Sequence, residues 1–108
     1  MNLPTEIFGD VLVVHAPEEL NEEHASRFRT YVLGQERMKV IVDLDSVELL
    51  DSAGLSTLLD VQENLQASSG DLKVISGSSI NRKILEITRL DQQLEVFDSV
   101  IDAVKSYV

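Results

Sequence analysis

The sequence has no cysteine, and this absence excludes disulfides, thiolate metal sites and thiol nucleophiles. Long apolar runs are absent as well: the longest spans Val11 to Val14, far too short to cross a membrane. The first residues, Met1 to Glu6, contain no basic stretch followed by an apolar one, so a signal peptide is not expected. The expected location is therefore the cytoplasm.

Basic residues are scarce. Nine Lys and Arg stand against nineteen Asp and Glu, which gives a net charge of −10. Such a chain repels the phosphate backbone of nucleic acids and the surface of anionic membranes, so neither is an expected partner. A basic protein surface fits better, although the same charge can simply keep a domain soluble.

The chain length of 108 residues and the hydrophobic content of 44% are typical of one globular domain. Gly9-Asp10 is typical of a tight turn between two short strands. Further strands are expected at about 38–43, 72–75 and 94–97. Capping residues predict helices that begin after Asn21, at Asp51 or Ser52, after Ser78 or Ser79, and after Asp98 or Ser99.

The resulting order, β-β-α-β-α-β-α-β-α, predicts an α/β fold with a small, mostly parallel mixed sheet and about four helices. Apolar spacing predicts which residues of the last two helices face the core. These residues are Ile80, Ile84, Leu85 and Ile87 in the third helix, and Val100, Ile101, Val104 and Val108 in the fourth.

Signals for catalysis are weak. The segment Asp51-Ser52-Ala53-Gly54-Leu55 does not match the G-x-S-x-G pattern of hydrolases. The two histidines, His15 and His24, are nine residues apart and form no metal-binding pair. We expect His15 at a sheet edge or in the core, and His24 facing solvent.

Signals for ligands are also weak. The run Ser76 to Ser79 leads from a strand into a helix and can hold an anion, but a turn with a helix cap is the simpler interpretation. The acids Asp43, Asp45, Glu48 and Asp51 lack the spacing of a calcium loop. We expect neither a metal nor a cofactor.

Ser52 is the most informative candidate because it lies where a strand leads into a helix. Its ordinary role there is to cap the helix. Gly54 costs the first turn about 1 kcal/mol relative to alanine, which indicates that another element or a partner excludes a larger side chain. Ala53 and Gly54 also leave the Ser52 hydroxyl open, so Ser52 is a candidate phosphoacceptor as well as a cap.

These residues carry a resemblance. Val40-Ile41-Val42-Asp43-Leu44-Asp45-Ser46-Val47, followed three residues later by Asp51-Ser52-Ala53-Gly54-Leu55, resembles the STAS family of bacterial anti-sigma factor antagonists. The order of elements also matches, so residues 1–108 are expected to form one STAS-like domain. The resemblance implies a non-enzymatic regulator that binds an anti-sigma factor serine kinase. Phosphorylation of Ser52 by that kinase ends the binding, and a serine/threonine phosphatase restores it; ATP and Mg²⁺ belong to the kinase.

The resemblance also implies a partner-binding surface around the second helix. Its expected members are Asp51, Ser52, Ala53, Gly54, Leu55, Ser56 and Asn21, and its expected polar rim is Ser56, Thr57 and Asp60. One departure concerns the segment before the first helix, where the family often has Gly-Glu-Leu-Asp. Here it is Glu18-Glu19-Leu20-Asn21, so Asn21 keeps a cap but lacks a charge that looks important for kinase recognition.

This departure motivates an alternative function: a constitutive STAS accessory or scaffold subunit, in lipid transport or a signalling complex, that phosphorylation does not control. A hydrolase that uses Ser52 is a third possibility. As an anti-sigma factor antagonist, the protein is expected to be a monomer or a weak dimer.

Overall fold

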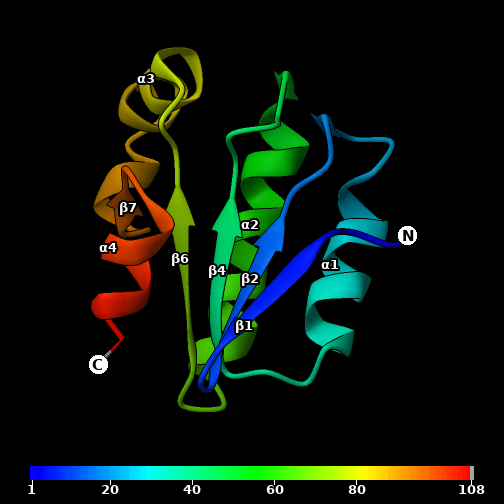
Figure 1. Ribbon diagram of the computed structural model, residues 1–108. Helices are drawn as coiled ribbons and strands as arrows, with labels where there is room; N and C mark the ends of the chain where they lie inside the picture. The colour runs from blue at the N-terminus through cyan, green and yellow to red at the C-terminus, as the bar shows by residue number, and fades with distance from the viewer. Residues whose placement is uncertain (108) are drawn as a thin grey trace.

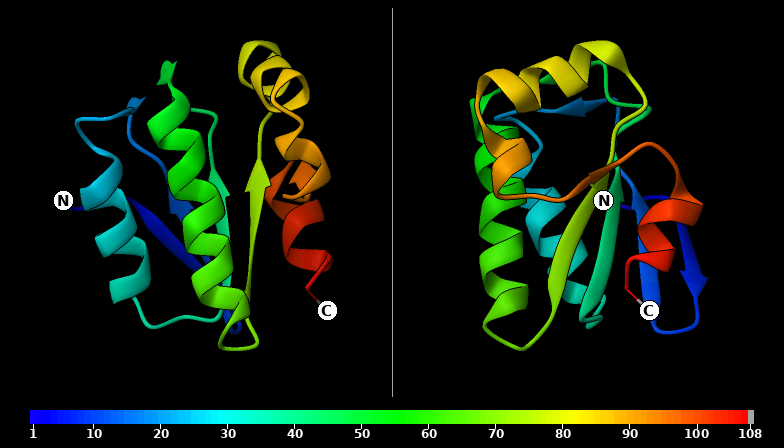
Figure 2. Two further views of the ribbon diagram at one scale, coloured as in Figure 1. Left: turned by 180° about the vertical axis from the view of Figure 1, so that it is seen from behind. Right: turned by 90° about the vertical axis from the view of Figure 1, so that its left-hand side faces the viewer.

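The computed structural model describes residues 1–107 and places a five-stranded sheet between helices on both faces (Figures 1 and 2). The strands lie in the order β1-β2-β4-β6-β7. Only β1 is antiparallel to its neighbour. The bounds of these strands are β1 Thr5–Phe8, β2 Val11–His15, β4 Lys39–Asp43, β6 Asp71–Ile75 and β7 Val96–Phe97.

Within residues 1–107, four α-helices connect or follow these strands, as expected. They are α1 (Ala25–Gly34), α2 (Ser52–Gln66), α3 (Ser79–Ile87) and α4 (Val100–Lys105), with a 3₁₀ turn η1 (Leu90–Gln92) after α3. The predicted α/β class, the element order and the mostly parallel sheet are confirmed. The tight turn is also confirmed: Gly9 adopts a φ of +63° between β1 and β2, a conformation that suits glycine.

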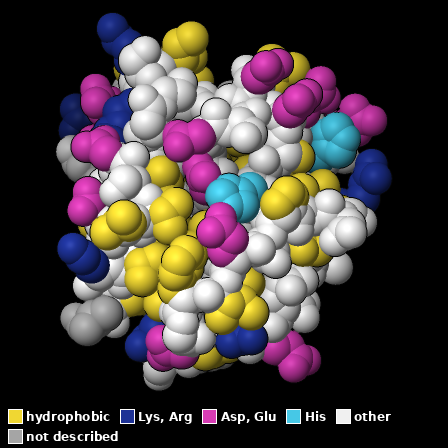
Figure 3. Space-filling model, in the orientation of Figure 1, with side chains coloured by type: hydrophobic (Ala, Val, Ile, Leu, Met, Phe, Trp, Pro, Cys, Tyr) yellow, Lys and Arg dark blue, Asp and Glu magenta, His cyan; other side chains and the backbone are white. Residues whose placement is uncertain are grey.

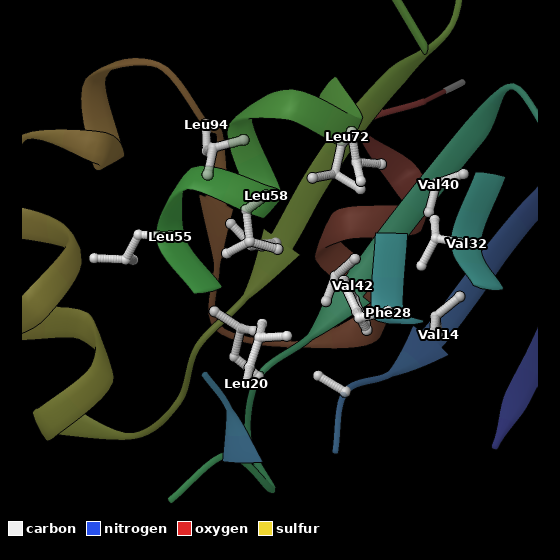
Figure 4. Close-up of a cluster of buried hydrophobic side chains, with 14 of the residues drawn as sticks. Val14, Leu20, Phe28, Val32, Val40, Val42, Leu55, Leu58, Leu72 and Leu94 are labelled. Atoms are coloured by element: carbon white, nitrogen blue, oxygen red, sulfur yellow. The ribbon is translucent and has the colours of Figure 1, made fainter. Parts of the chain in front are cut away.

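The main core lies on the sheet face that α1 and α2 cover, and Leu85 of α3 closes it at one end. Alternate residues of each strand point to this face, so Val14, Val42 and Leu72 meet Phe28 of α1 and Leu58 of α2 (Figure 4). The opposite face is covered by α4. There Val13, Ile41 and Ile75 pack with Ala103 in a second, smaller cluster.

A buried lysine fixes α4 to this second face. Lys73 on β6 is only 6% exposed, and its Nζ donates to the Ser106 hydroxyl oxygen (2.8 Å) and the Ser106 carbonyl oxygen (3.2 Å). The same ammonium lies 4.2 Å from the centre of the Tyr107 ring. The Tyr107 hydroxyl is held by the carbonyls of Val40 and Asp71. These contacts satisfy a charge that would otherwise be costly to bury.

The third helix packs differently from the expectation. Leu85 is buried and Ile84 is half-buried, but Ile80 and Ile87 are 73% and 72% exposed. Their predicted inward position is wrong because α3 uses Asn81 as its other inward residue. The Asn81 amide donates to the carbonyls of Leu44 and Val47, which rotates the isoleucines outward.

The fourth helix also departs in part. Ile101 is 65% exposed, whereas Val100 and Val104 pack against the second cluster. Val108 lies outside the described residues. The predicted cap of this helix is confirmed, since the Ser99 hydroxyl accepts from the Asp102 N–H.

A two-stranded sheet that the sequence did not predict lies at the end where the parallel strands finish. It pairs β3 (Glu19–Leu20) with β5 (Leu49–Leu50) in parallel. The carbonyl of Leu20 lies against the first turn of α2, and a Cβ added to Gly54 would be 2.0 Å from that oxygen. The glycine is therefore required by the close approach of another element.

We expect Gly54→Ala to destabilise the fold. The added methyl meets backbone, which cannot move cheaply, so the cost should approach about 3 kcal/mol and exceed the gain of about 1 kcal/mol in helix propensity. Urea unfolding followed by circular dichroism measures it. Gly34→Ala is the matched control: nothing lies within 4 Å of its added Cβ, so stability should be unchanged or slightly higher. Equal effects of the two substitutions would contradict this account.

His15, at the end of β2, joins the edge strand to the centre of the sheet. Its Nδ1 is 2.9 Å from a carboxylate oxygen of Asp43 on β4, and its Nε2 is 2.7 Å from one of Glu6 on β1. Burial lowers the pKa of His15, but the two hydrogen-bonded carboxylates outweigh it, so the net pKa is raised above 6.5. The folded protein therefore favours the imidazolium.

This shift predicts a pH dependence of stability. Because the folded-state pKa is raised, the contribution of His15 is fully present below the unfolded-state value of about 6.5 and is lost as pH rises through the folded-state value. The free energy of unfolding of wild type minus that of His15→Gln should therefore be larger at pH 6 than at pH 9. Urea titrations across this range test it, and a difference that grows with pH would contradict the assignment.

Candidate functional site

The candidate site is the N-terminal end of α2, and Asp51 organises it. Its Oδ1 accepts the Gly54 N–H at 2.9 Å, so Asp51 is the helix cap. Its Oδ2 accepts the Glu22 N–H at 3.0 Å, which ties the turn before α1 to the start of α2. The backbone N–H groups of Gly54 and Glu22 hold the pKa of Asp51 below its ordinary value.

Ser52 is the first residue of α2 and is exposed. Of the two candidates for the cap, Asp51 takes the role and Ser52 does not. Among residues 1–107 no hydrogen bond of the Ser52 hydroxyl is found, so this exposed side chain has no hydrogen-bonding role there. The helix start thus presents a free hydroxyl beside an ionised carboxylate.

Asn21 lies beside this site but does not cap α1. A turn intervenes, and α1 begins only at Ala25, so the expected cap at Asn21 is wrong. The Asn21 carbonyl instead accepts the N–H groups of His24 and Ala25, and its Oδ1 lies 3.1 Å from Nδ1 of His24. His24, expected to face solvent, is half-buried by this contact.

The other predicted site residues divide by exposure. Ser56 is exposed and Ala53 is half-buried, so both can meet a partner directly. Gly54 and Leu55 are buried and act within the chain by positioning the helix; Figure 4 shows Leu55 directed at α3. Thr57 and Asp60, which were predicted to lie at the polar rim, also serve the fold. Thr57 is buried, and Asp60 is half-buried in an ion pair with Arg29 of α1.

Exposed carboxylates gather next to Ser52. We call them the acidic rim: Glu18, Glu19, Glu22, Glu23, Glu48 and Asp51. They come from residues 18–23, which contain β3, and residues 48–51, which contain β5, and the pairing of β3 with β5 holds the two segments together. Figure 3 shows acidic side chains clustered over β3 and the turn that leads to α1. This end therefore presents a negative surface to any partner.

Within the described chain, neither histidine forms a hydrogen bond with a serine hydroxyl. Both nitrogens of His15 face carboxylates, and Nδ1 of His24 faces Asn21. The anion position at Ser76 to Ser79 is filled by this chain itself, because Asp45 accepts the Gly77 N–H at 2.7 Å and Ser78 caps α3. In the described part of the chain, Ser52 therefore has no hydrogen-bonded histidine of the kind that activates a nucleophilic serine.

One trio in residues 1–107 has side-chain atoms placed as metal ligands would be. Ligand atoms of Glu19, Glu23 and His24 lie within 4.8 Å of one another. Both carboxylates are exposed, and the histidine already faces Asn21. We therefore treat the trio as part of the acidic surface. No helix among the described residues is long and apolar enough to cross a membrane.

Comparisons with known proteins agree with this architecture. A protein of Thermotoga maritima, named provisionally as an anti-sigma factor antagonist, is 26% identical over 106 residues and covers 94% of each chain. A crystal structure of a protein so named from the same organism has a TM-score of 0.86 at 27% identity, covering 96% of this chain and 92% of that one.

More distant structures share the fold. The anti-sigma factor antagonist SpoIIAA in its unphosphorylated form has a TM-score of 0.75 at 19% identity, covering 99% of each chain. The Bacillus cell fate determinant SpoIIAA in the phosphorylated form has a TM-score of 0.69 at 17% identity, covering 99% of this chain and all of that one.

The family model for the STAS domain matches residues 2–103, nearly the whole chain. The sheet order, the capped α2 and the exposed serine at its start lie within that match. The chain therefore belongs to the STAS domain family.

Proposed function

We propose that this protein is an anti-sigma factor antagonist that acts in the cytoplasm as a non-enzymatic partner switch. It binds an anti-sigma factor serine kinase through the surface around Ser52, and phosphorylation of Ser52 ends the binding. A serine/threonine phosphatase returns it to the binding form. The partner-binding surface comprises Asp51, Ser52, Ala53 and Ser56, with Asn21 beside them and Gly54 and Leu55 beneath.

One observation carries the proposal: an exposed serine, whose hydroxyl forms no hydrogen bond within residues 1–107, begins a helix whose cap is the preceding aspartate. A kinase needs an accessible hydroxyl, and the described part of the fold makes no use of this one. Proteins named as anti-sigma factor antagonists are among the relatives, and SpoIIAA is known in phosphorylated and unphosphorylated forms. These relatives support the same role here.

The electrostatics support a switch that acts on binding. A phosphoserine adds about −1.5 to −2 charges at pH 7. At position 52 these charges would join Asp51 and the rest of the acidic rim, while a helix start tolerates an anion within the domain itself. A partner surface pressed against Ser52 would have to desolvate the phosphate beside a carboxylate. Binding should therefore lose more free energy than folding does.

We predict that protein isolated from its native host carries a phosphate on Ser52. Intact-mass analysis should detect a species heavier by one phosphoryl group, and Ser52→Ala should abolish it because no other hydroxyl is adjacent to Asp51. Ser68→Ala, which removes an exposed serine beyond the C-terminal end of α2 and outside the proposed binding surface, should leave the heavier species unchanged. A heavier species that persists in Ser52→Ala would refute Ser52 as the acceptor.

We also predict that Ser52→Asp weakens binding to the cognate kinase without unfolding the protein. Placing a further negative charge in the contact should cost at least tenfold in Kd, measured by isothermal titration calorimetry. Ser68→Asp is the matched control, since this exposed serine follows the opposite end of the same helix. The urea midpoint of Ser52→Asp should stay near that of wild type.

The alternative function, a constitutive STAS accessory subunit, predicts the opposite results for the intact-mass analysis and for the binding of Ser52→Asp. Its complex would form equally well with wild type and Ser52→Asp, and the isolated protein would carry no phosphate. The uncharged Asn21 is the feature that favours this alternative. Restoring the family's charge with Asn21→Asp separates the two, because only a kinase substrate should then be phosphorylated faster.

A further inference from the structure

Two large apolar side chains are exposed on the outer side of α3, with the exposed Lys83 one turn from each. Ile80 and Ile87 lie two turns apart on one side of the helix and are 73% and 72% exposed. Covering these two aliphatic side chains with a partner would gain hydrophobic free energy that the free chain leaves unused. The inward face of α3 is already satisfied by Leu85 and by the hydrogen bonds of Asn81.

This face adjoins the Ser52 site. The first turn of α3 is bound through Asn81 to the carbonyl of Val47, only two residues before Leu49, which is itself 54% exposed. Leu55 of α2 is directed at α3 (Figure 4), and Ile84 of α3 packs against the core cluster that contains Leu55. In Figure 2 α3 crosses the same end of the molecule at which α2 begins. A partner seated on Ser52 therefore meets α3.

Charge limits what this partner can be. Leu49 pairs in register with Glu19 and follows Glu48, so apolar and acidic side chains alternate at the boundary of the surface. A second copy of this chain would bring the same acidic rim against itself, and an anionic lipid surface would also be repelled. A protein surface with an apolar patch flanked by Lys or Arg is complementary to both parts.

We propose that the α3 face formed by Ile80 and Ile87, with Leu49, is a second contact region for the protein that docks at Ser52, and that the acidic rim receives basic residues of that protein. The inference rests on the proposed function, because the occupant is the partner that meets Ser52. The apolar region attracts the partner whether or not Ser52 is phosphorylated, and phosphorylation of Ser52 determines whether the partner is released.

A photo-crosslinking experiment in the native host tests the occupant. The photoreactive residue p-benzoylphenylalanine replaces Ser56, Ile87 or Ile101 in three separate variants. Ser56 reports the protein docked beside Ser52, Ile87 reports the α3 face, and Ile101, on α4, is an equally apolar control that is 65% exposed. The probes at Ser56 and Ile87 should capture the same protein, and the probe at Ile101 should not capture it.

Calorimetry with that captured protein, once purified, tests the contribution of the face. The double variant Ile80→Ala/Ile87→Ala should weaken binding at least tenfold, whereas Ile101→Ala should leave Kd within twofold of wild type. Both isoleucines are exposed, so the urea midpoint should not change. Raising the salt concentration should weaken binding further, because the acidic rim is screened.

The outcomes separate this inference from the function proposed above. Capture at Ile87 of nothing, of a second copy of this chain, or of a protein other than the one at Ser56 overturns it, as does wild-type affinity of the double variant. If Ser52 is phosphorylated and the kinase is captured only at Ser56, the inference fails and the function stands. If both probes capture one protein that never modifies Ser52, the function fails and the α3 contact stands.

Discussion

The close approach of α2 to the Leu20 carbonyl is the constraint on which the site depends. Only a residue without a Cβ fits there, and Gly54 supplies it. Because the helix start can come this close, the Asp51 carboxylate reaches both its own first turn and the Glu22 N–H. The short β3 and β5 strands are held at the same place. Ser52 is left as the residue that these contacts do not use.

The same arrangement determines where a phosphate would act. A helix start offers free N–H groups to an anion, but the Asp51 carboxylate already accepts one of them and one from the preceding turn. A phosphate on Ser52 would therefore find a site that is partly neutralised and would face outward among carboxylates. The phosphate would therefore change the free energy of folding little. Its effect would be on binding, because a partner would have to desolvate the phosphate and the Asp51 carboxylate together.

Sequence patterns predicted the elements whose signals are local. Short apolar runs and turn chemistry identified the hairpin and the parallel strands, and the unusual glycine at position 54 indicated a close approach by another element or a partner. The patterns failed where position depends on distant partners. The two-residue strands β3 and β5 are too short to have a period, and α1 begins four residues later than the capping signal at Asn21 because a turn intervenes. Helical spacing also could not reveal that Asn81, held by two loop carbonyls, would direct Ile80 and Ile87 outward.

The exposed isoleucines of α3 would bind a partner by apolar contact, whereas a phosphate on Ser52 would repel it by charge. Because the two interactions are physically independent, one can be changed without the other. Apolar contact is not screened by salt and does not depend on the charge at position 52, so it can hold a partner whether or not Ser52 is phosphorylated. Repulsion from a phosphate extends over about 8 Å at physiological ionic strength and needs no change of shape in this chain. A partner that touches both regions can therefore bind firmly through α3 and still be released by one group added to Ser52. In an interface built from charge alone, salt would screen both the attraction that holds the partner and the repulsion that releases it, so the two could not vary independently.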